Sequence, residues 1–72
     1  MLKITLEAAR RNAGFTQKEV ASALKVSNKT VGNWENYISS PTIAQAEQLC
    51  SLYKIPYDNI SFLPINSLKA NT

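Results

Sequence analysis

Two helix-start signals lie eleven residues apart in this chain, and no other feature constrains its fold as strongly. Thr16 and Glu19 have the spacing of a capping box, in which each side chain bonds a free backbone N–H of the other residue. Ser27 has the residue type of a second N-cap. A helix over about residues 17–24 fits between the two signals, with a tight turn after it. We therefore expect two short helices joined by a turn between Thr16 and Asn36.

Similar signals predict one helix on each side of this segment. Thr5 is an N-cap candidate for the sequence LEAARRNA, and Gly14 suits the left-handed residue that ends such a helix. Pro41-Thr42-x-x-Gln45 is a second capping box. The helix that follows it has a predicted apolar face made of Ile43, Ala46, Leu49, Cys50 and Tyr53.

The last part of the chain predicts a fifth, short helix. Ile55-Pro56 opens this helix, which continues through Ile60 and Phe62. Leu63-Pro64 ends it, because proline cannot continue a helix. No segment alternates apolar and polar residues as a strand would. We expect an all-α domain of five helices over residues 1–64, followed by a flexible tail over residues 65–72.

Two lysines stand where helices of this kind usually end in glycine. Lys25 follows the second predicted helix, and Lys54 follows the fourth. The chain leaves a helix there with a positive φ, which costs a residue with a Cβ atom about 1 kcal/mol. We therefore predict strain at Lys25 and expect Lys25→Gly to raise the melting temperature.

The amino-acid content argues against an enzyme, a metal site and a membrane protein. The chain has no histidine and a single cysteine, Cys50, so it lacks the usual general base, a zinc ligand set and an internal disulfide. No apolar run approaches the roughly 18 residues that span a membrane, and no signal peptide is visible. We expect a small cytoplasmic domain that is not an enzyme, with no cofactor, no metal, no small-molecule ligand and no membrane partner.

Positive charge is concentrated in the half of the chain that holds the two central helices. The first forty residues contain six basic side chains against three acidic ones, a surplus that equals the net charge of +3. The six are Lys3, Arg10, Arg11, Lys18, Lys25 and Lys29, and the three are Glu7, Glu19 and Glu35. Such a surplus suits a nucleic-acid partner, although one of this size also arises by chance.

The second helix of the central pair has two different faces. Val31 and Trp34 are three residues apart and point together, so Trp34 is expected in the core rather than stacked on a base. The other face has no apolar residue and consists of Asn28, Lys29, Gly32, Asn33 and Asn36. On an arbitrary helix such a face is merely solvated. In a helix-turn-helix the second helix enters the major groove of DNA, and that placement favours a binding face.

Four residues of this face are predicted to contact bases: Asn28, Lys29, Gly32 and Asn33. Asparagine can pair with N6 and N7 of adenine, and lysine can donate to O6 and N7 of guanine. Asn28 and Lys29 are the strongest candidates because the helix N-terminus lies deepest in the groove. Gly32 leaves two interpretations open: close approach of the backbone to a base, or an exposed glycine tolerated at a cost of about 1 kcal/mol.

A second set of polar residues is predicted to contact phosphates. Gln17 lies in the first turn of its helix, where free N–H groups and the positive end of the dipole suit an anion. The alternative is an ordinary solvent-facing glutamine. The other candidates are Thr16, for which capping is the favoured role, and Asn36, Tyr37, Ser39 and Ser40.

Together these residues resemble the helix-turn-helix family of Cro and repressor-type regulators of phage and bacteria, often called the Xre family. The match runs along TQKEVASALKVSNKTVGNWEN, with Arg10 before it and Pro41-Thr42 and Leu49-Cys50-x-x-Tyr53 after it. It covers about sixty of the 72 residues. The chain departs from the family pattern at Lys25, Tyr37 and Lys54, where glycine is usual, and at Cys50, where a small aliphatic residue is usual.

The resemblance implies a five-helix, lambda-repressor-like domain. It also implies that Gln17 holds the DNA backbone and can brace the first base-contacting residue. In this family the arginine at position 10 pairs with the glutamate at position 35 and ties the first helix to the third. A planar guanidinium suits that bidentate role better than an ammonium group.

We therefore expect a sequence-specific, double-stranded DNA-binding transcriptional regulator, most simply a Cro-like repressor. One domain offers too small a contact for tight binding, so a homodimer on a palindromic operator is expected. Phe62, Leu63 and Ile65 are the predicted dimer contacts. The alternative is a protein-interaction module of the same fold, such as an antitoxin or anti-regulator.

Overall fold

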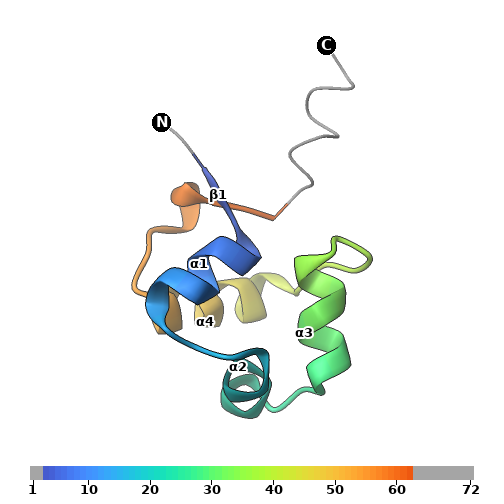
Figure 1. Cartoon of the computed structure of the whole chain (residues 1–72). Helices are drawn as coiled ribbons and strands as arrows, with labels where there is room; N and C mark the ends of the chain where they lie inside the picture. The colour runs from blue at the N-terminus through green and yellow to red at the C-terminus, as the bar shows by residue number, and fades with distance from the viewer. Residues whose placement is uncertain (1–2, 63–72) are drawn as a thin grey trace.

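The computed structural model describes residues 3–62, and α-helices dominate that part of the chain (Figure 1). In chain order the elements are β1 (Ile4–Thr5), α1 (Leu6–Ala13), α2 (Gln17–Leu24), α3 (Asn28–Glu35), α4 (Ile43–Tyr53), the 3-10 helix η1 (Tyr57–Asn59) and β2 (Ile60–Ser61). Within residues 3–62, none of these helices has the length and apolar character that a membrane crossing requires.

All four α-helices begin at the predicted cap residues. The hydroxyl of Thr5 accepts a hydrogen bond from the N–H of Ala8, and the hydroxyl of Ser27 accepts one from Thr30. Both predicted capping boxes, at Thr16 and Thr42, are complete. These side chains satisfy N–H groups that have no partner inside the helix, which is why short local motifs were sufficient to predict the starts.

The helix ends confirm the predicted left-handed conformation at the two lysines. Gly14, Lys25 and Lys54 are left-handed, with φ of 85°, 60° and 56°. A third non-glycine residue, Tyr37, has φ 59° just after α3. At each end the N–H of the residue after the left-handed one bonds a carbonyl five positions back, which defines a Schellman motif.

The predicted fifth helix is wrong. Over this segment the chain forms the single turn η1 and then extends as β2, which pairs in parallel with β1. Ile4 lies opposite Ile60 and Thr5 opposite Ser61, so three of these four residues are β-branched and suited to extended backbone. The chain therefore has four α-helices and a two-stranded sheet within residues 3–62. The predicted end of the fifth helix at Leu63-Pro64 and the predicted tail, 65–72, lie outside the described residues.

The core lies between the helices and against the β1–β2 pair. Its buried members are Leu6, Ala9, Val20, Ala21, Val31, Trp34, Leu49, Cys50, Tyr53 and Ile60. Burial raises the pKa of Tyr53 to about 12, so its phenol stays neutral at physiological pH. Ile43, predicted on the apolar face of α4, does not join the core with the other four members of that face, because it is 74% exposed at the first position of the helix.

Candidate nucleic-acid interface

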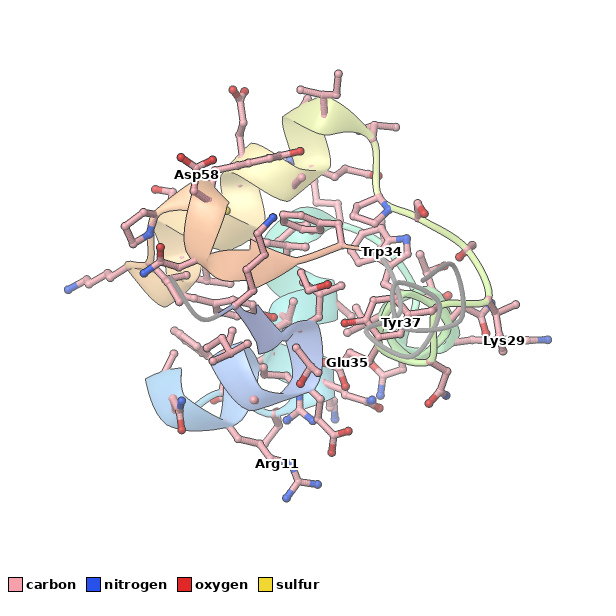
Figure 2. All side chains as sticks on the ribbon, turned by 90° about the horizontal axis from the view of Figure 1, so that it is seen from above. Arg11, Lys29, Trp34, Glu35, Tyr37 and Asp58 are labelled. Carbon is pink, nitrogen blue, oxygen red and sulfur yellow. The ribbon has the colours of Figure 1, made fainter. Side chains whose placement is uncertain are left out.

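The candidate interface is built on α3, which has one buried and one exposed face. Val31 and Trp34 are 1% and 3% exposed and belong to the core, as predicted. Asn28 and Lys29, at the start of the helix, are exposed, and Figure 2 shows Lys29 pointing away from the body of the protein. Gly32 and Asn33 are half-buried, and Asn36 is exposed. Each residue of the face predicted to contact bases is therefore at least partly accessible.

The structure brings Gln17 to this face of α3. Gln17 is the first residue of α2, and its side-chain amide donates to Oε1 of Glu35 at 2.9 Å. A Cβ atom built on Gly32 would lie 3.9 Å from Nε2 of Gln17, which is an ordinary van der Waals distance. The predicted phosphate-contacting residue thus lies beside the predicted base-contacting helix. Because an amide carries two N–H donors, bonding to Glu35 leaves a donor for a phosphate.

Arg10 and Glu35 form a buried pair that connects α1 with α3. Nε of Arg10 lies 2.7 Å from Oε2 of Glu35, and Nη2 lies 3.3 Å from Oε1. The two side chains are 10% and 5% exposed. The hydrogen bond to Glu35 raises the pKa of Arg10 against the opposing effect of burial, so the guanidinium remains charged. The structure therefore shows the bidentate geometry that the resemblance implied.

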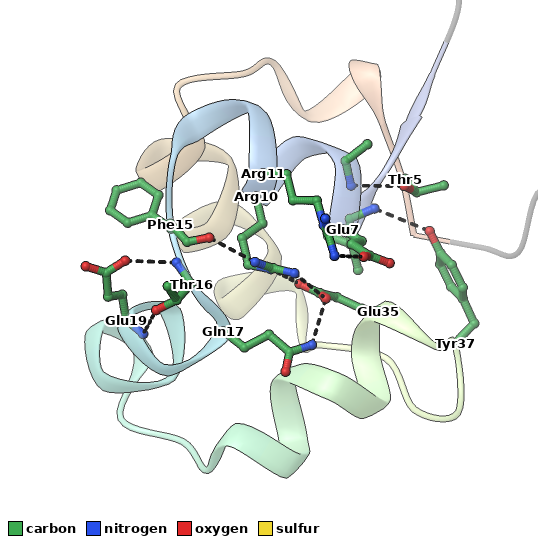
Figure 3. Close-up of polar contacts among 12 residues, drawn as sticks. Thr5, Glu7, Arg10, Arg11, Phe15, Thr16, Gln17, Glu19, Glu35 and Tyr37 are labelled. Carbon is green, nitrogen blue, oxygen red and sulfur yellow. Dashed lines mark hydrogen bonds and ion pairs between the residues drawn. The ribbon is translucent and has the colours of Figure 1, made fainter.

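Two further bonds make this pair part of a larger network, which Figure 3 displays. Nη1 of Arg10 donates to the backbone carbonyl of Phe15 at 2.9 Å, and Gln17 donates to Glu35 as described above. One guanidinium therefore connects α1, the loop before α2, and α3. Sequence reasoning missed the Gln17–Glu35 bond because it depends on the distance between two helices, which no local spacing encodes.

The remaining phosphate candidates lie at both ends of the helix pair. Thr16 is exposed, and its hydroxyl accepts from the N–H of Glu19 at 3.1 Å, so it acts as a cap. Asn36, Ser39 and Ser40 are exposed in and after the turn that follows α3. The N–H of Ser39 points back to the carbonyl of Asn33 at 3.4 Å, which keeps this turn close to the helix.

Tyr37 has an internal role that was not predicted from the sequence. Its hydroxyl accepts from the N–H of Leu6 at 3.4 Å and donates to the carbonyl of Ser61 at 3.0 Å. Figure 3 shows the ring reaching from the turn after α3 to the start of α1. A hydroxyl has a single O–H, and Ser61 uses it, so the expected donation from Tyr37 to a phosphate does not fit this arrangement. The sequence offered one sign of this role, because Tyr37 stands where the family usually has glycine.

Positive charge near α3 is smaller than the sequence count suggests. Arg10 is neutralised by Glu35, and Arg11 forms an exposed ion pair with Glu7 at 2.8 Å. The lysines that remain around the helix pair include Lys18, Lys25 and Lys29, which are all exposed. Lys29 is the basic residue of α3 itself. Any contact with an anion therefore depends on a few well-placed groups rather than on a strong overall field.

Comparison with known proteins agrees with this geometry. A family model described as helix-turn-helix matches residues 6–60. The HTH-type transcriptional regulator ImmR of Bacillus subtilis (strain 168) is 36% identical over 53 residues, which cover 74% of this chain. The match spans 42% of the length of ImmR. No solved structure matches the chain significantly. The chain belongs to the Cro and repressor-type helix-turn-helix family, as the sequence resemblance predicted.

Proposed function

We propose that this domain binds double-stranded DNA with sequence preference, places α3 in the major groove and thereby regulates transcription. The observation that carries the proposal is the division of α3 into a core face, with Val31 and Trp34, and an accessible polar face beside Gln17. In a helix-turn-helix, a short helix and a tight turn precede a second helix that packs on the core with one face and docks in the groove with the other. The relative ImmR is named a transcriptional regulator, which supports the same function.

The proposed contacts fall into two classes. Asn28, Lys29 and Asn33 contact base edges, with the backbone at Gly32 close enough to meet a base or a thymine methyl. The phosphate contacts come from the amide of Gln17 at the start of α2, and from Thr16, Asn36 and Ser39. The first class confers sequence preference, and the second sets the orientation of the domain on the duplex.

We further propose a Cro-like repressor that binds a palindromic operator as a homodimer. Its half-sites would lie about one helical turn apart, because that spacing places two α3 helices on the same side of the duplex. Phe62, at the end of the described residues, is half-buried against the core. Leu63 and Ile65, the other expected dimer contacts, lie outside the described residues. Sedimentation of the protein with and without operator DNA tests this, and a monomer on operator DNA would reject it.

The main experiment separates base contacts from phosphate contacts. Bound sites are first selected from random DNA at a stated salt concentration, and affinity is then measured on the selected site and on random DNA. Asn28→Ala and Lys29→Ala should each lose about 1–3 kcal/mol of discrimination. Gln17→Ala should weaken binding to both DNAs alike. Lys18→Ala is the matched charge control, because Lys18 is exposed on α2 and should also act on both DNAs equally.

Two results would contradict the proposal. Equal losses on both DNAs for all of these variants would exclude direct base contacts by α3. If the unmodified protein binds no DNA at any salt concentration, the alternative of a protein-interaction module, such as an antitoxin or anti-regulator, takes its place.

Gly32→Ala tests the predicted close approach of α3 to the bases. Inside the protein the new methyl group meets an ordinary contact at 3.9 Å, so the fold does not require glycine there. Alanine should therefore stabilise the helix by about 1 kcal/mol. Close approach predicts weaker operator binding by this more stable variant. A stabilised variant that binds as tightly as the original protein would exclude it.

A further inference from the structure

The end of α3 is held differently from the ends of the other three α-helices in residues 3–62. In a Schellman motif the residue after the left-handed one usually makes an apolar contact. Phe15, Val26 and Ile55 do so, because each is partly buried against the core. The corresponding residue after α3 is Ile38, which is 72% exposed. The usual contact is therefore missing where α3 ends.

At this helix end the left-handed residue itself makes the tertiary contact. The hydroxyl of Tyr37 lies between the N–H of Leu6, at 3.4 Å, and the carbonyl of Ser61, at 3.0 Å. Leu6 is the first residue of α1, whose N–H groups need partners from outside the helix. Ser61 is the β2 residue opposite Thr5. One hydroxyl therefore fixes the turn after α3 to the point where β1, α1 and β2 meet.

The residues on either side of Tyr37 are the ones proposed to contact the DNA backbone. Asn36 and Ser39 are exposed, and their backbone N–H groups bond the carbonyls of Gly32 and Asn33 in α3. Their side-chain directions follow from the left-handed turn between them. A shift of φ at Tyr37 would move Ser39 relative to Asn36, so both can meet one phosphate only if this turn is fixed.

We propose that Tyr37 is a positioning residue for DNA binding: its hydroxyl holds Asn36 and Ser39 in place to donate to a backbone phosphate. This inference rests on the proposed function. Tyr37 does not touch the DNA in this arrangement, because its O–H already donates to Ser61. The partner is recognised by its phosphate, so this contact carries no sequence information.

Tyr37→Phe removes the hydroxyl and keeps the ring. Affinity should fall by about fivefold on operator and random DNA alike. This is the loss expected when one hydrogen bond from the turn to the phosphate is no longer made. The salt dependence of binding should stay unchanged, because Asn36 and Ser39 carry no charge. The amide of Leu6 should exchange faster in the free protein. Tyr57→Phe is the matched control: Tyr57 is 47% exposed in η1, and losing its hydroxyl should leave binding unchanged.

A double-mutant cycle separates positioning from general destabilisation. If Tyr37 acts through the turn, then adding Tyr37→Phe to an Asn36→Ala, Ser39→Ala variant should cause little further loss of affinity. Losses that simply add would overturn the proposal, as would a folded Tyr37→Phe variant with unchanged affinity. Should Tyr37→Phe fail to fold, the same substitution is made in the Lys54→Gly background, where strain at the end of α4 is relieved, and unchanged affinity relative to that background would again overturn it. Absence of DNA binding by the unmodified protein would instead reject the proposed function itself.

Discussion

The chain leaves α2 and α3 with the same backbone conformation, but different contacts stabilise the two helix ends. Both helices end in a Schellman motif with a non-glycine residue in the left-handed conformation, Lys25 at φ 60° and Tyr37 at φ 59°. After α2 the side chain of Lys25 is exposed, and the next residue, Val26, packs partly buried on the core. After α3 the next residue, Ile38, is exposed, and Tyr37 itself bonds distant parts of the chain.

The comparison shows where each turn obtains its stability. A left-handed residue with a Cβ atom costs roughly 1–2 kcal/mol. At Lys25 the strain is offset by the neighbouring residue in the sequence, so the turn between α2 and α3 is local. At Tyr37 it is offset by partners 31 and 24 residues away. The last turn of α3 also contains Glu35, which bonds Arg10 from α1. The end of α3 therefore depends on the whole domain being folded.

The largest loss of stability is expected at the buried ion pair between Arg10 and Glu35, which connects the end of α3 with α1. Glu35→Gln keeps the shape of the side chain but leaves the buried guanidinium of Arg10 without its countercharge. Removing one member of a buried pair costs about 3–5 kcal/mol, which is a large part of the stability of a domain this small. Urea denaturation measures the loss. The control is Glu7→Gln in the exposed pair with Arg11, which should change stability by only about 0.3 kcal/mol. Equal changes would mean that the buried pair has no special role.

A smaller loss of stability is expected from Tyr37→Gly. Glycine removes the left-handed strain, but the two hydrogen bonds of the hydroxyl and the half-buried ring are lost with the side chain. These contributions leave a net destabilisation of about 2 kcal/mol. The midpoint of urea denaturation reports it. A more stable Tyr37→Gly variant would break the comparison, because both turns would then be limited by strain alone.

The smallest change in stability is expected from Lys25→Gly, and this change is an increase. The side chain of Lys25 is exposed, so glycine removes strain and little else. Stability should rise by about 1 kcal/mol, which raises the melting temperature of a domain this size by roughly 4–8 °C. Lys54→Gly should behave in the same way, since Lys54 ends α4 with φ 56° and is also exposed. A fall in melting temperature for either variant would show that its lysine side chain contributes to the fold.

Features determined within four residues could be predicted from the sequence. The caps at Thr5, Thr16, Ser27 and Thr42 join residues three apart, so their spacing alone was informative. The two faces of α3 follow from helical periodicity in the same way.

Features that join distant residues could not be predicted in this way. The pairing of β1 with β2 involves two residues on each side, which is too short to produce a pattern. It replaced the expected fifth helix because extended backbone there completes a sheet with residues near the start of the chain. Within the candidate interface, the Gln17–Glu35 and Tyr37–Ser61 bonds were missed for the same reason. The Arg10–Glu35 pair was anticipated only through the family resemblance.

The parallel pair β1–β2 also has a kinetic consequence. Ile4 lies opposite Ile60, so this contact closes a loop that contains almost all of the described residues. Helices form from local contacts, whereas closing so long a loop costs entropy that only the assembled core can offset. We expect α2 and α3 to form early in folding and the strand pair to close late. Because the hydroxyl of Tyr37 is bonded at this junction, we expect the turn after α3 to reach its final shape only when the strand pair closes.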